Sequence, residues 1–152
     1  IVAAGIPVLG HLGLTPQSAS KLGGFRVQGK DAAGARQIIA DAVSLERAGC
    51  FAIVLECIPQ AVAAMITKKL TIPTVGIGAG IWCDGQVLVT YDMLGFFDRF
   101  CPKFVKKYAD LSLVIGDGFA RYKADVRSGA FPAPEHAFLI ADAELAKIKK
   151  AR

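Results

Sequence analysis

Four short apolar runs lie in the first ninety residues of the chain, and each has the length of a β-strand. The runs are rich in Val, Ile and Leu and lack the strict alternation of a strand with one solvated face. Parallel strands that are covered on both faces have this pattern. The predicted strands are Ile6–Leu9, Phe51–Leu55, Thr74–Ile77 and Val87–Val89.

Helical patterns separate the first three runs. Apolar side chains recur at helical spacing over Ala32–Ala48, and Gly49 provides a stop signal. The pattern repeats over Gln60–Leu70, and Pro73 prevents this helix from continuing. The alternation of strands and helices with short connections predicts an α/β fold built from parallel, right-handed crossovers.

Beyond the third run the pattern changes. The segment Gly78–Gln86 is too short for a full helix, so we expect a tight loop or a single helical turn there. Helices are predicted over Phe104–Lys107 and Gly118–Ser128, and an Ala/Lys/Glu-rich tail from Asp142 to Arg152 predicts a last helix. The Pro-rich stretch Phe131–Pro134 is read as a docked arm or a loop.

The composition is that of a folded domain and not of a disordered chain. Of the 152 residues 53% are hydrophobic and 20% are charged, and the mean hydropathy is +0.44. The net charge of +5 is spread along the chain, so its lysine runs are read as solvated helix faces. The longest apolar runs are too short to cross a membrane. We therefore expect neither a nucleic-acid nor a membrane partner.

Four cysteines and two histidines limit the metal chemistry that the chain can support. No CxxC pair is present among Cys50, Cys57, Cys83 and Cys101, so a zinc cage is not expected. Unpaired cysteines in apolar strands are typical of a reducing compartment, which predicts a cytoplasmic protein. The first residues lack a basic segment followed by a long apolar one, so no signal peptide is predicted.

Two residues at strand ends are candidates for catalysis. Glu56 ends the second apolar run, where burial disfavours an ionised carboxylate and suits it to proton transfer; the alternative is a salt-bridged structural glutamate. His11 follows the first run, and ligands of parallel α/β folds gather at the carboxyl ends of the strands. It is read either as a substrate-binding or proton-transfer group, or as a structural histidine that ties two loops together.

Three further features have weaker signals. The glycines of Val75–Gly80 would let a ligand approach the backbone, but the run does not complete a dinucleotide fingerprint, so NAD binding is not predicted. A plain tight turn is the alternative. Asp84 and Gly85 are read mainly as a turn before the next strand. The pattern suggests no histidine partner for Cys57, so we expect a small core residue and not a nucleophile.

Five segments, in this order, resemble the ketopantoate hydroxymethyltransferase family. Two of them are quite specific: the His-Leu-Gly-Leu-Thr-Pro-Gln string that begins at His11, and the Gly-Gly-Phe-Arg-Val-Gln-Gly string at 23–29. The similarity runs from about residue 6 to residue 136. The remaining segments are Leu55–Pro59, Ile77–Gly80 and Asp84–Gln86, and Gly129–His136 resembles the closing region of the family.

The resemblance implies a (β/α)8 TIM barrel, of which this chain supplies about strands 5–8. Residues 1–140 would form the C-terminal half of the barrel domain and residues 141–152 a C-terminal tail. Half a barrel leaves two open strand edges, so we expect an N-terminal half that completes it. The resemblance also implies a homo-oligomer, often a decamer in this family, with the Pro-rich arm and the tail gripping neighbouring subunits.

The resemblance also implies a one-carbon transfer. The family moves a hydroxymethyl group from 5,10-methylenetetrahydrofolate to 3-methyl-2-oxobutanoate, giving ketopantoate on the route to pantothenate and coenzyme A. Glu56 matches the general base that removes a proton from C3, and Mg²⁺ stabilises the enolate. By its place in the matched motif, His11 is implied to lie beside the substrate, and Gly78 belongs to the pocket wall. The family's metal ligands lie in the N-terminal half, so none is expected in this chain.

Two other functions remain open at this point. Another Mg²⁺-dependent carbon–carbon bond enzyme on a related barrel, of the isocitrate lyase or phosphoenolpyruvate mutase type, shares the keto-acid chemistry but has different loop signatures. A barrel half that serves as an assembly or regulatory subunit would not be an enzyme. Turnover without folate would favour the first, and a 16.0 kDa product with no longer form would favour the second.

Overall fold

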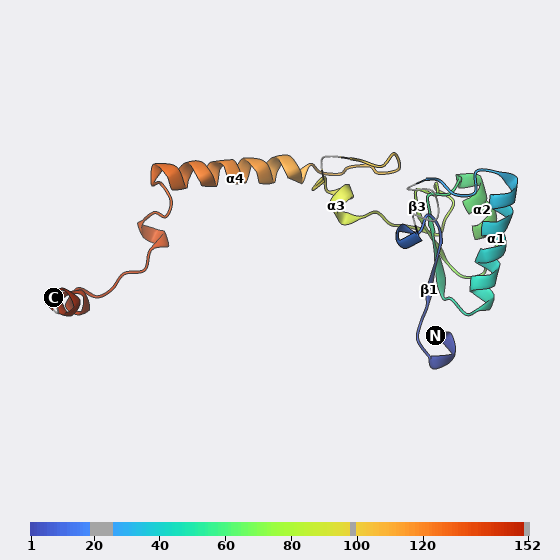
Figure 1. Cartoon of the computed structure of the whole chain (residues 1–152), viewed down its shortest axis with the longest axis horizontal. Helices are drawn as coiled ribbons and strands as arrows, with labels where there is room; N and C mark the ends of the chain where they lie inside the picture. Colours follow the sequence, from blue (N-terminus) through green and yellow to red (C-terminus); the bar gives the residue numbers. More distant parts are fainter. Residues whose placement is uncertain (19–25, 98–99, 151–152) are drawn as a thin grey trace. The chain divides into compact units, whose positions relative to one another are not determined.

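The computed structural model describes residues 1–18, 26–97 and 100–150 of the chain (Figure 1). The Gly23–Phe25 part of the family motif lies outside the described residues. The chain divides into two compact units, Ile1–Ala109 and Asp110–Arg152, each with its own secondary structure. We call them unit 1 and unit 2.

Unit 1 is built on a four-stranded sheet in which every strand runs parallel to its neighbour. The strand order is β1-β2-β3-β4, so strands that are consecutive in sequence lie side by side. This confirms the predicted parallel α/β arrangement, and the four strands are consistent with part of a barrel. Their bounds are Leu9–Gly13 (β1), Ala52–Glu56 (β2), Thr74–Ile77 (β3) and Gly85–Gln86 (β4).

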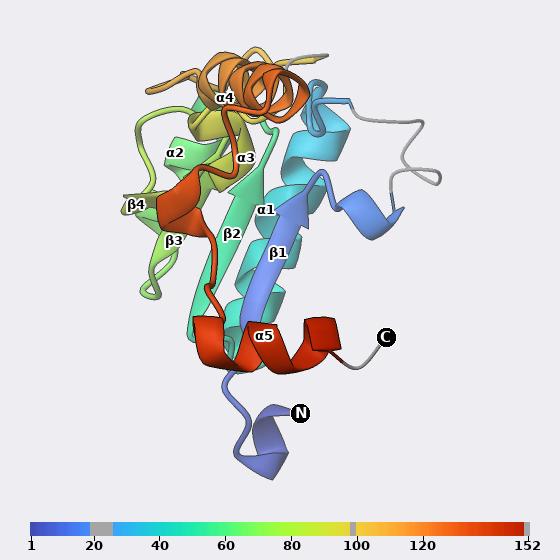
Figure 2. The ribbon, with the colours of Figure 1, turned by 90° about the vertical axis from the view of Figure 1, so that its left-hand side faces the viewer.

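Two helices cover one face of this sheet, and the core of unit 1 lies between them and the strands. Helix α1 spans Ala32–Arg47 and helix α2 spans Gln60–Lys69, close to the predicted bounds. Figure 2 shows α1 running behind β1 and β2. Burial of apolar side chains on this face is the main stabilising contribution of unit 1. The core consists of Ile38, Ala42, Ile53, Leu55, Ile58, Val62, Ala63, Ile66, Leu70 and Ala79.

The first strand begins later than the sequence predicts. The run Ile6–Leu9 was expected to be the strand, but β1 starts at Leu9 and continues to Gly13. The pairing partner decides this, because Leu9 lies opposite Ala52 at the start of β2 and the ladder continues from there. His11 therefore lies within a strand and not in the loop after it.

The fourth strand begins earlier than predicted, at Gly85 and not at Val87. Gly85 and Gln86 lie opposite Val75 and Gly76 of β3, and the amide of Val87 still donates to the Gly76 carbonyl. The tight connection after β3, which the sequence did predict, places the Asp-Gly pair directly against that strand. Asp84 stays in the bend that precedes the strand, and Gly85 is the first residue of β4.

The helix predicted over Phe104–Lys107 is absent, and these residues form a turn and an irregular segment instead. The amide of Val105 donates to the carbonyl of Pro102 in a single turn, and the amide of Tyr108 donates to the carbonyl of Met93. The second bond draws the chain towards the short helix α3 (Thr90–Met93) and out of a helical path.

Unit 2 consists of two helices and the segment between them. Helix α4 spans Leu111–Ser128, so it begins seven residues before the predicted Gly118, and it ends at Gly129 in the left-handed conformation. The Pro-rich arm continues into a 3₁₀ turn at Pro134–His136. Helix α5 spans Asp142–Lys150, in agreement with the predicted tail helix. None of the helices in the described residues is long and apolar enough to span a bilayer.

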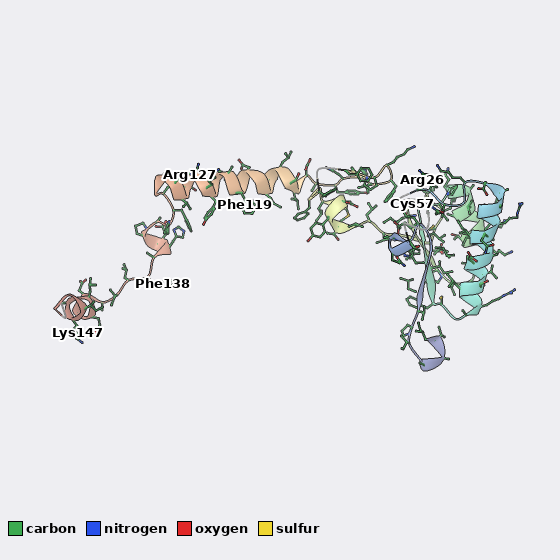
Figure 3. The ribbon with its side chains drawn as sticks, viewed as in Figure 1. Arg26, Cys57, Phe119, Arg127, Phe138 and Lys147 are labelled. Atoms are coloured by element: carbon green, nitrogen blue, oxygen red, sulfur yellow. The ribbon has the colours of Figure 1, made fainter. Side chains whose placement is uncertain are left out.

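Apolar side chains of α4 form an exposed stripe in unit 2. Ile115, Phe119, Tyr122 and Val126 follow one another at helical spacing, and none of the α4 residues is buried. Figure 3 shows Phe119 projecting outward from the helix, with an exposed fraction of 69%. The rings of Tyr122 and Phe131 lie 5.7 Å apart, so the start of the Pro-rich arm docks on the end of α4.

Candidate functional site

Glu56 and His11 meet on the sheet of unit 1. The Nε2 atom of His11 lies 3.0 Å from Oε2 of Glu56, and their side chains are 33% and 16% exposed. No cationic residue stands next to Glu56 along the chain, whereas the structure supplies a partner from the adjacent strand. Glu56 is therefore paired, as in the alternative reading of the sequence, but its partner is a histidine. A carboxyl group and an imidazole are thus in direct contact.

Strand alternation explains why these two side chains meet. Successive residues of a strand point to opposite faces of the sheet. Ile53 and Leu55 point to the helices, so Val54 and Glu56 point to the other face. His11 lies opposite Val54 in the parallel register, and it is thus a diagonal neighbour of Glu56 on the same face. The pair stands at the carboxyl end of the sheet, where α/β enzymes carry their ligands.

Gly13 lets the end of β1 pass close to Glu56. It has a φ of +91°, and a Cβ atom at this position would collide with the carbonyl oxygen of Glu56. The amide of Leu14 donates to that same carbonyl at 2.9 Å. Glycine avoids both the steric collision and the strain of the left-handed conformation. The glycine in the sequence motif therefore fixes the backbone around the carboxylate.

Cys57 follows Glu56 with a backbone conformation that is unusual for a residue with a side chain. Its φ is +50°, its amide donates to the carbonyl of Ile77, and its own carbonyl accepts from the amide of Gln28. Arg26, two residues before Gln28, lies in the same region as Cys57 (Figure 3). Burial, and secondarily the charge of Glu56, raises the pKa of the Cys57 thiol. A protonated, buried thiol agrees with the predicted packing role, because the thiolate is the nucleophilic form.

A pocket of about 660 Å³ opens beside Cys57, beyond the ends of β2 and β3. Gly78, the glycine singled out in the sequence, is one of the residues that line it. Gln60, Lys103 and Phe104 line it too, although no signal in the sequence singled them out, because Lys103 was read as part of a solvated lysine run. We call it the strand-end pocket. Its lining is Val27, Cys57, Ile58, Gln60, Gly78, Gly80, Ile81, Gln86, Lys103 and Phe104.

The conformation of Gly78 shapes this pocket. Gly78 has a φ of +64°, and a Cβ atom there would lie 2.8 Å from the ring of Phe104. The ring therefore packs directly on the glycine backbone. The loop thus forms a surface on which an aromatic side chain rests.

His11 also lines a second, smaller pocket of about 330 Å³. Gly34, Gln37 and Asp41 of α1 line it too, so this pocket lies at the border between β1 and α1. The structure thus brings the two residues predicted for catalysis, His11 and Glu56, into contact.

Asp84 has a structural role in the loop that leads from β3 to β4. Its Oδ2 atom accepts from the Thr74 amide at 2.8 Å and from the Thr74 hydroxyl at 2.9 Å. The Thr74 hydroxyl also lies 2.8 Å from that of Thr67 on α2. The backbone and hydroxyl hydrogen bonds from Thr74 hold the pKa of Asp84 below its ordinary value. Asp84 therefore ties the β4 entry to the start of β3.

The described residues do not assemble a metal site on their own. No group of three or more His, Cys, Asp or Glu side chains within 1–18, 26–97 and 100–150 is placed to hold an ion. Mg²⁺ prefers octahedral coordination by oxygen atoms. Glu56 supplies a carboxylate at the strand ends, and its Oε2 atom is engaged by His11. The residues that the structure describes therefore bring together fewer oxygen donors than Mg²⁺ requires.

A parallel sheet with helices on one face, and with a His–Glu pair on the other, defines unit 1 as an α/β fold. Residues 1–134 match the sequence model of the family described as Ketopantoate hydroxymethyltransferase. The match covers most of the 152 residues, so the chain belongs to this family.

Curated relatives carry the name 3-methyl-2-oxobutanoate hydroxymethyltransferase. The relative from Syntrophobacter fumaroxidans is 57% identical over 148 residues, which are 97% of this chain and 52% of that protein. The relative from Nitratidesulfovibrio vulgaris is 56% identical over 95% of this chain and 47% of its own length. The relative from Enterococcus faecalis is 54% identical over 97% of this chain and 54% of its own length. The chain thus spans about half the length of these relatives.

Proposed function

We propose that the protein carrying this chain transfers a hydroxymethyl group from 5,10-methylenetetrahydrofolate to 3-methyl-2-oxobutanoate and forms ketopantoate, for pantothenate and coenzyme A biosynthesis. The observation that carries the proposal is the family membership of residues 1–134 together with a glutamate at the carboxyl end of β2. Each of the three relatives named above has this reaction's acceptor in its name.

Glu56 is the proposed general base of this reaction. The C3–H bond of the keto acid is weakly acidic, so a positioned carboxylate must take the proton as the enolate forms. The Glu56 side chain is only 16% exposed, which limits competition from water for its oxygen atoms. Water adds to the methylene carbon of the folate, and cleavage of its two C–N bonds releases tetrahydrofolate and leaves the one-carbon unit at the oxidation level of formaldehyde. The enolate carbon bonds to this carbon, and the oxygen on it takes up one proton, which balances the one that Glu56 removed from C3, to give the hydroxymethyl group.

His11 is the proposed positioning partner of this base and a proposed substrate contact. When Glu56 is ionised, the Nε2–H group of His11 can donate to Oε2 at the observed 3.0 Å. That bond fixes the rotamer of the carboxylate and aims its other oxygen atom at the substrate. Gly78 is proposed to form part of the wall against which the substrates pack, because Phe104 rests on it.

The remaining barrel half is proposed to complete the site. Parallel sheets are covered on both faces in stable proteins, yet Leu9, at the start of β1, is 49% exposed on the face opposite the helices. The N-terminal half of a (β/α)8 barrel would cover this face and provide the oxygen ligands of Mg²⁺ that the described residues lack. When bound, Mg²⁺ would supply the positive charge that stabilises the enolate oxygen.

The experiment that tests the function is deuterium exchange at C3 of 3-methyl-2-oxobutanoate in D₂O with Mg²⁺, followed by NMR on the full-length protein. Exchange needs the base and no folate. We expect the wild-type protein to catalyse it and Glu56→Gln to reduce the rate by about 10²- to 10⁴-fold, the usual contribution of a general base.

The control for this experiment is Glu46→Gln, since Glu46 lies on α1 and binds the Thr71 and Ile72 amides away from the site. Its exchange rate should equal that of the wild type. Normal exchange by Glu56→Gln would refute the base assignment. Absence of exchange in the wild-type full-length protein would refute the reaction itself and would favour the non-enzymatic alternative.

Homo-oligomer formation is also proposed, with unit 2 as the contact region. The apolar stripe Ile115, Phe119, Tyr122 and Val126 exposes large side chains that a stable protein covers. A second copy of the chain would supply that cover through symmetric contacts of the same patch. A decamer is the subunit number that we propose for the assembly.

A cytoplasmic location is proposed on the state of the cysteines. Cys50, Cys57, Cys83 and Cys101 are all free thiols. Free thiols in this number persist in a reducing compartment.

A further inference from the structure

We propose that Gln28 is a positioning residue of the reaction, which holds Glu56 in place through the backbone of Cys57. This role rests on the proposed function, in which Glu56 is the general base. It also gives a task to residues 26–29, the described part of the Gly-Gly-Phe-Arg-Val-Gln-Gly string. That string is one of the two most specific motifs of the chain, and the proposed function leaves it without a role.

The backbone that follows Glu56 has a conformation that needs support from its surroundings. Cys57 has a φ of +50°, in the left-handed region, where a residue with a side chain is crowded. Such a conformation persists when contacts from other segments fix it. This φ and the ψ of Glu56 orient the peptide unit that joins the two residues, and the Glu56 side chain branches from one end of that unit. A change at Cys57 would therefore redirect the carboxylate.

Three hydrogen bonds from three different segments hold the backbone at this point, each with an N···O distance of 2.9 Å. The Leu14 amide, just after β1, donates to the Glu56 carbonyl. The Cys57 amide donates to the carbonyl of Ile77, the last residue of β3. The Gln28 amide donates to the Cys57 carbonyl, and this donor comes from outside the four strands. Gln28 therefore holds the crowded residue on the side that the sheet does not reach.

The side chain of Gln28 fixes the direction of its own backbone amide. Its Nε2 atom donates to the carbonyl of Arg26 at 2.9 Å, and the chain bends at Gln28. Figure 3 shows Arg26 in the same region as Cys57. A glutamine side chain can make this bond because its amide nitrogen is a donor, whereas an apolar side chain of the same length cannot. Loss of the donor would release the bend and weaken the bond to the Cys57 carbonyl.

Gly29 attaches this segment to helix α1 and so to the core of unit 1. It has a φ of +69°, and a Cβ atom at this position would lie 2.8 Å from the Cδ1 atom of Ile38, a core residue. A Cβ atom at Gly34, in the first turn of α1, would lie 3.3 Å from the Cα atom of Gly29. Glycine at both positions allows this close packing. Gln28 thus stands between a rigid neighbour and the base, which makes its bond to Cys57 a fixed restraint.

A direct contact with the substrate is the alternative role of Gln28. Gln28 lines the smaller pocket together with His11, which the proposed function places beside the keto acid. The two roles differ in their kinetics, because loss of a positioning residue lowers kcat, whereas loss of a ground-state substrate contact raises KM. Both hydrogen bonds of Gln28 described above go to backbone carbonyls of the protein, which favours positioning.

The test measures C3 deuterium exchange of 3-methyl-2-oxobutanoate by the full-length protein with Mg²⁺, as a function of the keto-acid concentration. In Gln28→Met the side-chain amide is lost at nearly constant length. We expect kcat for exchange to fall about three- to tenfold, which corresponds to the loss of one hydrogen bond, and KM to keep its wild-type value. Urea titration shows that the variant is folded under the assay conditions.

Gln37→Met is the matched control. Gln37 lines the same smaller pocket, but its Nε2 atom donates to Oδ1 of Asp41, on its own helix, at 2.8 Å. Its kcat and KM should equal those of the wild type. An equal loss of kcat in the two variants would overturn the proposal, because the pocket that they share would then explain both.

The remaining outcomes separate the role of Gln28 from the proposed function. An unchanged kcat in Gln28→Met, with an active wild type, overturns the positioning role and leaves the general base standing. A raised KM at unchanged kcat also overturns it, because Gln28 would then contact the substrate. Absence of exchange in the wild-type protein overturns both proposals.

Discussion

The Nε2 atom of His11 and the Oε2 atom of Glu56 lie 3.0 Å apart, although 45 positions separate the two residues in the chain. The contact crosses from β1 to β2 on the face that the helices leave open. A hydrogen bond to a partly buried carboxylate restricts the rotamers that it can adopt. The pair is therefore the unit whose chemistry the mutations below probe.

Replacement of His11 should separate orientation from proton transfer. His11→Ala removes the bond to Glu56, and we expect C3 exchange to fall about 10- to 100-fold, less than the loss from removing the base itself. His11→Gln places an amide nitrogen near the position of Nε2, so most of the activity should return. Exchange rates from NMR provide the measurement. If His11→Gln is as slow as His11→Ala, then His11 moves a proton and does more than position the base.

Substitution of Gly78 should damage both the backbone and the strand-end pocket. In Gly78→Ala the residue must adopt a φ of +64° and place its Cβ atom 2.8 Å from the ring of Phe104. The left-handed conformation alone costs about 1–2 kcal/mol for a residue with a side chain. We expect a lower free energy of unfolding, measured by urea titration, and a higher KM for the substrates.

Gly116→Ala is the matched control for this prediction. Gly116 lies in helix α4, and a Cβ atom there would meet no neighbour within 4 Å. Alanine favours a helix over glycine by about 1 kcal/mol, so this variant should be equal to the wild type or more stable. Equal stabilities of Gly78→Ala and the wild type would contradict the strained geometry described for the loop.

Neutralisation of Asp84 should destabilise unit 1 in a pH-dependent way. The pKa of Asp84 is lowered by the hydrogen bonds from Thr74, so the folded protein favours its ionised form. Its contribution to stability is then present above the unfolded pKa of about 3.9 and is lost as the pH falls through the folded value. Asp84→Asn should cost about 1 kcal/mol or less at pH 7, because solvent weakens the bonds of this exposed side chain.

Urea titrations at several pH values check this prediction. The difference in unfolding free energy between wild type and Asp84→Asn should be constant from pH 7 to about pH 5 and should shrink below about pH 4. Asp92→Asn, which neutralises a carboxylate on α3, is the control. A difference that grows on acidification would show that the sign of the effect is wrong.

The apolar stripe of α4 gives a prediction about assembly. Phe119→Glu puts a charge on a side chain that is 69% exposed in the isolated chain. Burying that charge in a subunit contact would cost several kcal/mol, so the oligomer should dissociate. Light scattering after size-exclusion chromatography measures the mass. Lys123→Glu changes the charge at a polar position of the same helix and should keep the wild-type mass; dissociation by both variants would indicate a general charge effect.

Much of unit 1 could be predicted from the sequence, because its local signals and its tertiary structure agree. The helix over 32–48 and the helix over 60–70 were found within a residue or two, since their apolar spacing, the stop at Gly49 and the block at Pro73 are all local. Strand β3 was found with its exact bounds. Strands β1 and β4 were displaced, because the position of a ladder depends on the partner strand and not on the apolar run alone.

The sequence by itself determined the family, the alternation of parallel strands and helices, and the choice of Glu56 and Gly78 as candidate site residues. Motifs and hydrophobic spacing are properties of the linear sequence, so they need no tertiary structure to be recognised. Only the tertiary structure decided that His11 belongs inside a strand and contacts Glu56, because that contact depends on the parallel register of two strands. Tertiary structure also placed Lys103 and Phe104 at the strand-end pocket. The segment that contains Phe104 is not the helix that its local periodicity predicts. The hydrogen bond from the Tyr108 amide to the Met93 carbonyl outweighs the weak helical preference of this segment.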